Sequence, residues 1–409
     1  MDKNITRTLG KSILEASTRF KVILLTGPRQ VGKTTLLQDI REPARTYITL
    51  DDLSLRMAAQ QDPASFLDRL SLPILIDEVQ YAPDLFPYIK MTVDKTKQNG
   101  LFWLTGSQQF DMMKNVTESL AGRVALLQLQ GISLAEEQGR SDDSPFLPDL
   151  AQLKSRQKTA KPLTVPEAYH KIWRGSYPDM VAHHTDQRWE QFYSSYVSTY
   201  IQRDVREYLN INDTAVFHKF MQIAAARTGQ LINYADMARD TGVSEVTIKT
   251  WLNVLHASGI IYLLQPYFNN RTKRLVKTPK LYFMDTGLCA YLTGWLNADV
   301  LERGAMSSAI LETWVIAEII KSYLHHSRTP RIYFYRDKEK REVDLLIEEN
   351  GTLYPIEIKK SAALHNMKFK GFSMLENLDT LVGHGGIICF ANTLIPVSDH
   401  VDAIPVGYL

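Results

Sequence analysis

The sequence predicts an α/β protein with three successive parts: a doubly wound parallel sheet, a helical and winged-helix middle, and a C-terminal mixed α/β domain. Near the N-terminus, "KVILLTGPRQVGKTTLLQDI" passes from a β-branched strand through a glycine loop into a helix. Near the C-terminus, two apolar runs are joined by Asn350-Gly351, the strongest short signal for a two-residue hairpin. The expected boundaries are 1–138 for the sheet domain, 139–163 for a linker, 164–210 for a helical segment, 211–300 for the winged helix and 301–409 for the C-terminal domain.

The composition is that of an ordinary globular protein. The 409 residues are 22% charged and 44% hydrophobic, and a net charge of +2 does not by itself indicate a nucleic-acid binder, so any such surface must be local. Cys289 and Cys389 are too few for a disulfide framework or a metal knuckle. With no apolar leader and no run of about 18 apolar residues, we expect a cytoplasmic protein without a membrane partner.

The glycine loop matches a phosphate-binding motif. Gly27 through Thr34 fit G-x-x-x-x-G-K-[ST] between a strand and a helix, the context in which backbone N–H groups cradle phosphates. Lys33 is expected to reach the β and γ phosphates, and Thr34 to bind Mg²⁺. The expected nucleotide-binding residues of this P-loop are Gly27, Pro28, Arg29, Gln30, Val31, Gly32, Lys33, Thr34 and Thr35.

Further strands end in polar residues. "PILIDEVQ" ends in Asp77, expected to hold Mg²⁺, and Glu78, expected to orient the attacking water; "LFWLTGSQQ" ends in Ser107 and Gln108. Strand-like runs lie near 21–26, 46–50, 73–77, 101–105 and 124–129. If these strands form one parallel sheet, their carboxyl ends lie at the same edge, and the polar residues that follow them meet there. This order resembles the AAA+ ATPases, and the resemblance implies ATP as cofactor and a phosphate sensor at Gln108 or Ser107, unless these are turn residues. Arg123 is either a γ-phosphate arginine or a helix C-terminal arginine.

The middle of the chain is predicted to be helical. Residues 139–163 lack periodicity, whereas an aromatic stripe indicates a packed helix formed around Phe192, Tyr193, Tyr196, Tyr200 and Ile201. Residues 231–256 have a helix-turn-helix pattern with Ala238 at the crossing, Gly242 in the turn and Ser244 as N-cap. Its expected core residues are Val243, Val246 and Ile248.

A basic segment follows the helix-turn-helix. Residues 271–280 carry five cations, Arg271, Lys273, Arg274, Lys277 and Lys280, enough to neutralise several phosphates. The segment "GIIYLLQPYFNNRTKRLVKTPKLYFMD" resembles the two strands of a wing around this basic tip, so the region resembles a winged-helix domain. We therefore expect phosphate contact without base readout. The alternative is that the winged helix serves as a protein lid.

The C-terminal hairpin places acids opposite each other. In a two-residue hairpin, residues whose numbers sum to 701 are paired, so Asp344 faces Glu357 and Glu342 faces Lys359. Val343, Leu345, Ile347, Ile356 and Ile358 should then form an apolar face opposite the charged one. Paired acids favour a divalent cation bound by Asp344 and Glu357. The alternative is a solvated sheet face with an ordinary Lys359–Glu342 pair.

Asp344 followed by Glu357-Ile358-Lys359 resembles the PD-(D/E)XK nuclease signature, with Val343 in place of proline. The resemblance implies that Asp344, Glu357 and Lys359 are catalytic, that Mg²⁺ or Mn²⁺ is the metal, and that Glu312 on the apolar helix "SAILETWVIAEII" completes the cluster.

The ordering of the whole chain resembles a group of prokaryotic AAA-type ATPases with a nuclease-like C-terminal half, through "TGSQQ", "GSYPD", "YFMDTGL" and "REVDLLI". It implies an ATP-hydrolysing protein that acts on nucleic acid through the 271–280 segment and the C-terminal domain. The alternative is a nucleotide-gated regulatory protein with a non-catalytic nuclease-like scaffold. Self-association as a homo-oligomer is left open.

Overall fold

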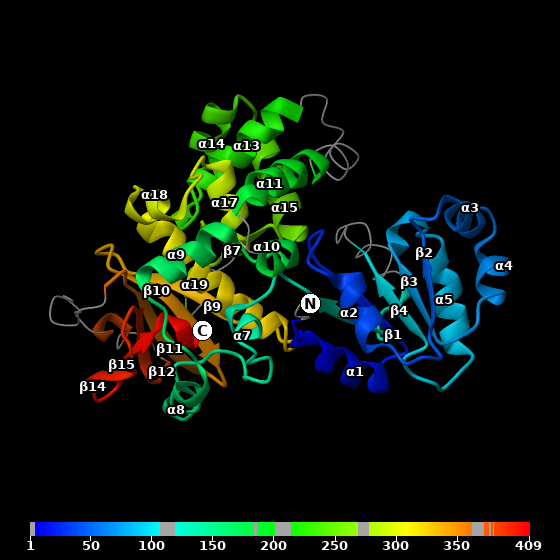
Figure 1. The fold of residues 1–409 in the computed structure, drawn as a ribbon, viewed down its shortest axis with the longest axis horizontal. Coiled ribbons are helices and arrows are strands. Elements are labelled where there is room, and N and C mark those ends of the chain that lie inside the picture. Colours follow the sequence, from blue (N-terminus) through cyan, green and yellow to red (C-terminus); the bar gives the residue numbers. More distant parts are fainter. Residues whose placement is uncertain are drawn as a thin grey trace.

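The computed structural model describes residues 5–106, 119–183, 186–200, 214–268, 278–361, 372–375, 378 and 380–409. The N-terminal sheet (blue to cyan) lies at one end of the molecule and the C-terminal sheet (orange to red) at the other, with the helical middle (green to yellow) above the latter (Figure 1). Among the described helices, none has the length and apolar character needed to cross a membrane.

The N-terminal domain is a five-stranded parallel sheet in the order β2-β3-β4-β1-β5. Its strands are β1 (Val22–Thr26), β2 (Thr46–Thr49), β3 (Ile74–Asp77), β4 (Phe102–Thr105) and β5 (Val124–Gln128). Its helices are α1 (Leu9–Arg19), α2 (Lys33–Ile40), α3 (Leu53–Gln61), α4 (Pro63–Asp68) and α5 (Leu85–Asp94), with a 3-10 turn η1 (Val79–Tyr81).

Helices cover both faces of this sheet. Ile23 of β1 packs in one apolar cluster with Ile13 of α1 and Leu37 of α2, whereas Leu24 packs on the other face with Ile89 of α5. The predicted doubly wound parallel sheet is therefore confirmed, because successive strand residues bury their side chains on opposite faces.

The middle of the chain is mainly helical. Its helices are α7 (Leu134–Glu137), α8 (Leu150–Thr159), α9 (Val165–Arg174), α10 (Pro178–Ala182), α11 (Asp186–Tyr200), α13 (Thr214–Ala226), α14 (Tyr234–Thr241), α15 (Glu245–Ala257), α17 (Thr286–Leu292) and α18 (Ala298–Arg303). A small antiparallel sheet has the order β6-β8-β7, from β6 (Gln230–Leu231), β7 (Ile261–Leu264) and β8 (Lys280–Phe283).

Local signals in this region act as expected, with two corrections. Gly242 ends α14 in the left-handed conformation (φ 87°), and the Ser244 hydroxyl accepts from the Thr247 N–H at 3.1 Å to cap α15. Val246, expected in the core, is 72% exposed, because it lies on the outer face of α15 while Ile248 points inward. The expected linker 139–163 contains helix α8, begun by an Asp149 cap and packed on the C-terminal domain.

The C-terminal domain joins a long helix to a mixed sheet. Helix α19 (Ser307–Leu324) precedes a sheet in the order β14-β15-β13-β11-β10-β9, with β12 beside β11. The strands are β9 (Ile332–Arg336), β10 (Glu342–Glu349), β11 (Thr352–Ile358), β12 (Leu381–Val382), β13 (Gly385–Cys389), β14 (Ile395–Ser398) and β15 (Val401–Pro405), and 3-10 turns lie at η4 (Ser373–Leu375) and η5 (Val406–Tyr408).

The predicted hairpin register is observed from Leu345↔Ile356 to Glu349↔Thr352, with Asn350 and Gly351 both at positive φ. The predicted pattern of faces is partly wrong. The β10–β9 register shifts between Val343 and Leu346, and such a bulge interrupts side-chain alternation. Val343 consequently clusters with Leu346, whereas Leu345 packs in the main core. Both faces of the hairpin thus carry buried apolar side chains, and Asp344 and Glu357 lie toward its open end.

Candidate active sites

The P-loop is shaped by two glycines in conformations that other residues avoid. Gly27 has φ 144°, and a Cβ there would lie 2.0 Å from the carbonyl oxygen of Leu129. Gly32 has φ 88° and precedes α2. The chain after β5 therefore packs directly against the loop, and glycine is required for this approach.

The predicted catalytic side chains of this loop converge. Lys33 is buried, and its Nζ donates to the carbonyl oxygens of Gly27 (3.1 Å) and Pro28 (2.8 Å). The Thr34 hydroxyl donates to Asp77 Oδ1 at 2.8 Å, which brings the two expected Mg²⁺ ligands into contact. A hydroxyl and a carboxylate are hard oxygen donors, so this pair fits Mg²⁺.

Two residues of this site were not predicted from the sequence. Thr105, at the end of β4, donates its hydroxyl to Asp77 and accepts the Glu78 N–H at 3.1 Å. Tyr47 of β2 donates to Asp77 Oδ2 at 3.4 Å. Thr105 was detectable in principle, because it is the polar residue that ends the buried run "FWLT" beside the Asp77 strand.

Glu78 itself has φ 56°, a left-handed conformation that is costly for a residue with a side chain. Such strain persists where the surroundings fix it, and here the Thr105 hydroxyl and a hydrogen bond from Gln80 to the carboxylate do so. Ser107 and Gln108 lie outside the described residues. Arg123 forms a two-point ion pair with Asp94 (2.5 and 3.0 Å), so its role in this structure is to tie β5 to α5.

A second cluster of charged groups lies at the open end of the C-terminal hairpin. Glu312 of α19, Asp344 of β10 and Glu357 of β11 come close enough for the charges of Glu312 and Glu357 to act on Asp344. Asp344 Oδ2 accepts the Ile358 N–H at 2.8 Å, and Lys359 Nζ lies 2.5 Å from Glu357. The four residues predicted as a nuclease-like set are therefore brought together. The predicted alternative, a Lys359–Glu342 surface pair, is not what forms.

Two further members of this cluster come from the middle domain. Lys280 of β8 is 5% exposed; its Nζ lies 3.2 Å from Glu312 and forms an ion pair with Glu342. The Tyr282 hydroxyl donates to Glu312 at 2.5 Å. Lys280 was expected to contact nucleic-acid phosphates; that expectation is wrong, because its ammonium group is buried on carboxylates. The remaining cations of the basic segment, at 271–277, lie outside the described residues.

The electrostatics of the cluster follow from crowding of like charge. Loss of hydration, then the charges of Glu357 and Glu312, raise the pKa of Asp344 to about 8. Burial lowers the pKa of Lys280, but Glu312, Glu342 and Asp344 outweigh it and leave that pKa above its ordinary value.

The metal predicted at Asp344 and Glu357 does not fit this arrangement. Among the residues that the structure describes, no group of three or more His, Cys, Asp or Glu side chains is placed to hold a metal ion. The ammonium of Lys280 lies between Glu312 and Glu342 instead.

A buried ion network fixes α19 to the P-loop domain. Arg7 donates to the carbonyl oxygens of Val31 (2.9 Å) and Gln130 (2.6 Å) and pairs with Glu136 (3.2 Å). Glu136 also lies 3.3 Å from His325, just beyond α19. Burial raises the pKa of Glu136, but Arg7 and His325 hold that pKa well below its ordinary value. The end of α19 is thus anchored beside the phosphate loop.

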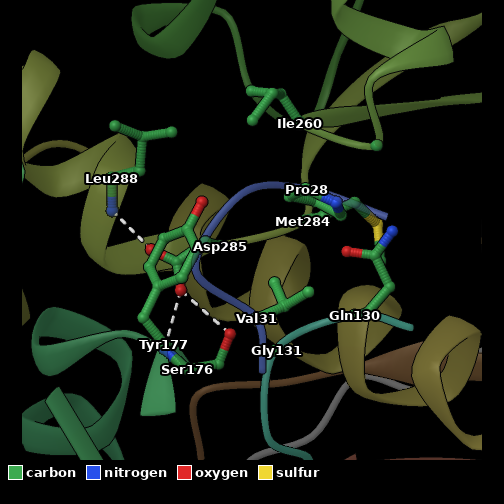
Figure 2. A pocket seen from close by; sticks show the side chains of 11 residues that line it. Pro28, Val31, Gln130, Gly131, Ser176, Tyr177, Ile260, Met284, Asp285 and Leu288 are labelled. Atoms are coloured by element: carbon green, nitrogen blue, oxygen red, sulfur yellow. Dashed lines mark hydrogen bonds between the residues drawn. The ribbon is translucent and has the colours of Figure 1, made fainter. Parts of the chain in front are cut away.

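A small pocket separates the P-loop from the middle domain. Pro28 and Val31 of the loop line this pocket together with Ser176, Met284 and Asp285 of the middle domain (Figure 2). The Asp285 carboxylate accepts from the Ser176 N–H at 2.6 Å and also from Tyr193 and Leu288. The quoted "GSYPD" and "YFMDTGL" motifs therefore meet opposite the phosphate loop.

Comparison with known proteins finds three family matches along the chain. Residues 19–137 match a family described as an AAA domain, residues 167–299 a domain of unknown function (DUF8612), and residues 307–409 another domain of unknown function (DUF4143). The P-loop and the Thr34–Asp77 pair lie within the residues that match the AAA domain, which supports an ATP site of the AAA+ type in this part of the chain.

Relatives along most of the chain are two uncharacterized mycobacterial proteins. Rv2008c of Mycobacterium tuberculosis and Mb2031c of Mycobacterium bovis are each 28% identical over 387 residues, spanning 95% of this chain and 80% of the relative.

Solved structures give only a distant likeness. RuvB of Thermotoga maritima, a Holliday junction branch migration motor, is 17% identical with a TM-score of 0.30, over 62% of this chain and 88% of its own. DnaA of Aquifex aeolicus is 14% identical with a TM-score of 0.28, over 61% and 85%. At these scores neither structure carries an argument about this chain.

Proposed function

We propose that this protein couples ATP hydrolysis at the P-loop to action on nucleic acid by the C-terminal domain, which has a nuclease-like site. The observation that carries the proposal is the convergence of Glu312, Asp344, Glu357 and Lys359 from one helix and two strands. Three acids and a lysine from distant parts of the chain are held together here, as the residues of a catalytic site are. We also propose that residues 211–300 form a winged-helix unit and 301–409 a PD-(D/E)XK-like domain.

At the ATP site, each residue has a role that its position supports. Lys33, at the start of α2, is placed to move from the loop carbonyls to the β and γ phosphates. Thr34 and Asp77 would hold Mg²⁺, which supplies charge neutralisation at the phosphates. Glu78 orients water for attack on the γ phosphate, and Thr105 fixes both acids relative to each other.

At the C-terminal site we derive no cleavage step, because the present arrangement does not fit a metal. This favours a second candidate function: a nucleotide-gated regulatory protein whose nuclease-like domain is a scaffold. The specific observation behind it is the ion pairing of Lys280 with Glu312 and Glu342, which neutralises the cluster without a metal.

Cleavage assays separate the two candidates. The full chain is incubated with plasmid, single-stranded DNA and RNA, with Mn²⁺ and with or without ATP. We expect nicking by the wild type in the presence of ATP, loss of this nicking in Asp344→Asn, and retention in Glu349→Gln. Glu349 is the matched control, because it lies at the far end of β10 and pairs with Arg328. A wild type that cleaves none of these polymers contradicts the nuclease proposal and supports the scaffold.

A further inference from the structure

Strand β8 belongs to the middle domain but carries side chains into the C-terminal cluster. Lys280 and Tyr282, two residues apart on the same strand face, both reach Glu312. Lys280 also pairs with Glu342, and the charge of Asp344 acts on it. One buried ammonium group thus pairs with two carboxylates of another domain and interacts with the charge of a third.

This ammonium group stands where a cation is required. Acids held together and partly removed from water are destabilising unless a positive charge compensates them. Lys359 is paired with Glu357 and its side chain is 45% exposed, so its charge acts on Glu312 without an ion pair between the two residues. Lys280 is the described cation that touches both Glu312 and Glu342.

The other end of β8 lies at the phosphate loop. Met284 and Asp285 directly follow the strand and line the same pocket as Pro28 and Val31 (Figure 2). The Met284 N–H donates to the Ile260 carbonyl at 2.9 Å, so β7 and β8 reach this pocket together. From residue 280 to residue 284 an extended chain spans about 13 Å. A short, paired strand therefore touches both sites.

We propose that Lys280 is a built-in counter-cation that excludes a divalent metal from the C-terminal cluster, and that nucleotide at the P-loop controls its release through β8. The inference rests on the proposed nuclease-like site and adds its regulation. Phosphates bound at the loop meet Pro28 and Val31, and a displacement there is passed by Met284 and Asp285 to β8. When Lys280 withdraws, Glu312 loses its buried counter-cation and Glu342 keeps Arg336 at 3.8 Å, so a divalent cation beside Glu312 would restore the balance of charge.

The test for the counter-cation measures Mn²⁺ binding to the full chain by calorimetry without nucleotide. An Asp77→Asn background removes the carboxylate of the P-loop metal pair. Lys280→Met removes the ammonium and keeps the aliphatic stem, and Lys360→Met is the control, because Lys360 pairs with Glu302 outside the cluster. We expect one Mn²⁺ per chain in the Lys280→Met variant, none in the background or the control, and at least tenfold weaker binding once Glu312→Gln is added.

Thermal unfolding provides a second measurement in case the Lys280→Met chain is too unstable for calorimetry. The Tm of the Lys280→Met chain should rise with Mn²⁺, and that of the Lys360→Met chain should not. A Lys280→Met chain that gains neither a Mn²⁺ site nor a Mn²⁺-dependent Tm overturns the proposal. Gain of the site without cleavage of any polymer would uphold the counter-cation and contradict the nuclease function.

The nucleotide arm uses the chain with Asp77 intact and a non-hydrolysable ATP analogue. One Mn²⁺ should bind with the analogue at the P-loop, and a second should appear as Lys280 is released. A single Mn²⁺ with the analogue bound overturns control by nucleotide. Failure of the analogue to bind contradicts the ATP site and the nucleotide control together, whereas the measurements without nucleotide still decide the role of Lys280.

Discussion

Replacing Asp344 by Asn should stabilise the protein, and increasingly so as the pH rises. The pKa of this carboxyl is raised from 3.8 to about 8 by lost hydration and by the charges of Glu357 and Glu312. At about 1.4 kcal/mol per pKa unit, this corresponds to a ceiling of about 6 kcal/mol. Asn keeps a carbonyl oxygen to accept the Ile358 N–H, so the substitution removes the charge and leaves the hydrogen bond.

The sign follows from proton binding in the two states. Below about pH 4, Asp344 is protonated in both the folded and unfolded chains and contributes no difference. Between about pH 4 and 8 the unfolded chain releases this proton while the folded chain keeps it, so the free energy of unfolding falls as pH rises. Above about pH 8 the folded carboxyl also ionises and the loss levels off.

Urea unfolding of the wild type and of Asp344→Asn at intervals from pH 5 to 9 measures this effect. The difference in the free energy of unfolding should grow by several kcal/mol up to about pH 8, with the variant more stable. Glu349→Gln, at the far end of the same strand, should not show this growth. A constant difference across this range, or a less stable Asp344→Asn chain at pH 8, would refute the account of a crowded carboxylate cluster.

Three predictions concern the ATP site. Lys33→Ala should lower ATP turnover at least about a hundredfold in a phosphate-release assay with the circular dichroism spectrum unchanged, and unchanged turnover would remove the P-loop assignment. Gly27→Ala should lower the free energy of unfolding by about 2–4 kcal/mol, because its Cβ would meet the Leu129 carbonyl; a smaller loss in urea unfolding would count against the close approach. Thr105→Val should lower kcat about tenfold or more with little change in KM, because Asp77 loses a hydrogen-bond partner; a change confined to KM would contradict this role.

Features set by neighbours in the chain could be predicted from sequence. The P-loop is specified by glycine spacing between a strand and a helix, and the hairpin register by Asn350-Gly351, whose two residues both take positive φ. The Ser244 cap and the Gly242 turn are likewise local. In each case the conformation depends on a few adjacent residues, so the sequence contains the whole signal.

Features that depend on contacts between distant segments could not be predicted from the sequence. The bulge between Val343 and Leu346 follows from pairing with β9, which has no local signature, and it reverses the expected face of Val343. Lys280 stands among basic residues in the sequence, and only the docking of β8 on α19 turns it into a partner of Glu312. Helix α8 lacks an apolar stripe and depends on packing against the end of the chain.

We propose that Asp77 and Glu78 build an ATP-hydrolysing site. Its most direct test measures both ATP turnover and nucleotide affinity of the purified Glu78→Gln chain. Glu15→Gln, an exposed change on α1, is the control. We predict turnover by the wild type and the control, and in Glu78→Gln an affinity within a factor of two and turnover lower by about a hundredfold or more. Wild-type turnover in Glu78→Gln, or none in the wild type, would contradict the account.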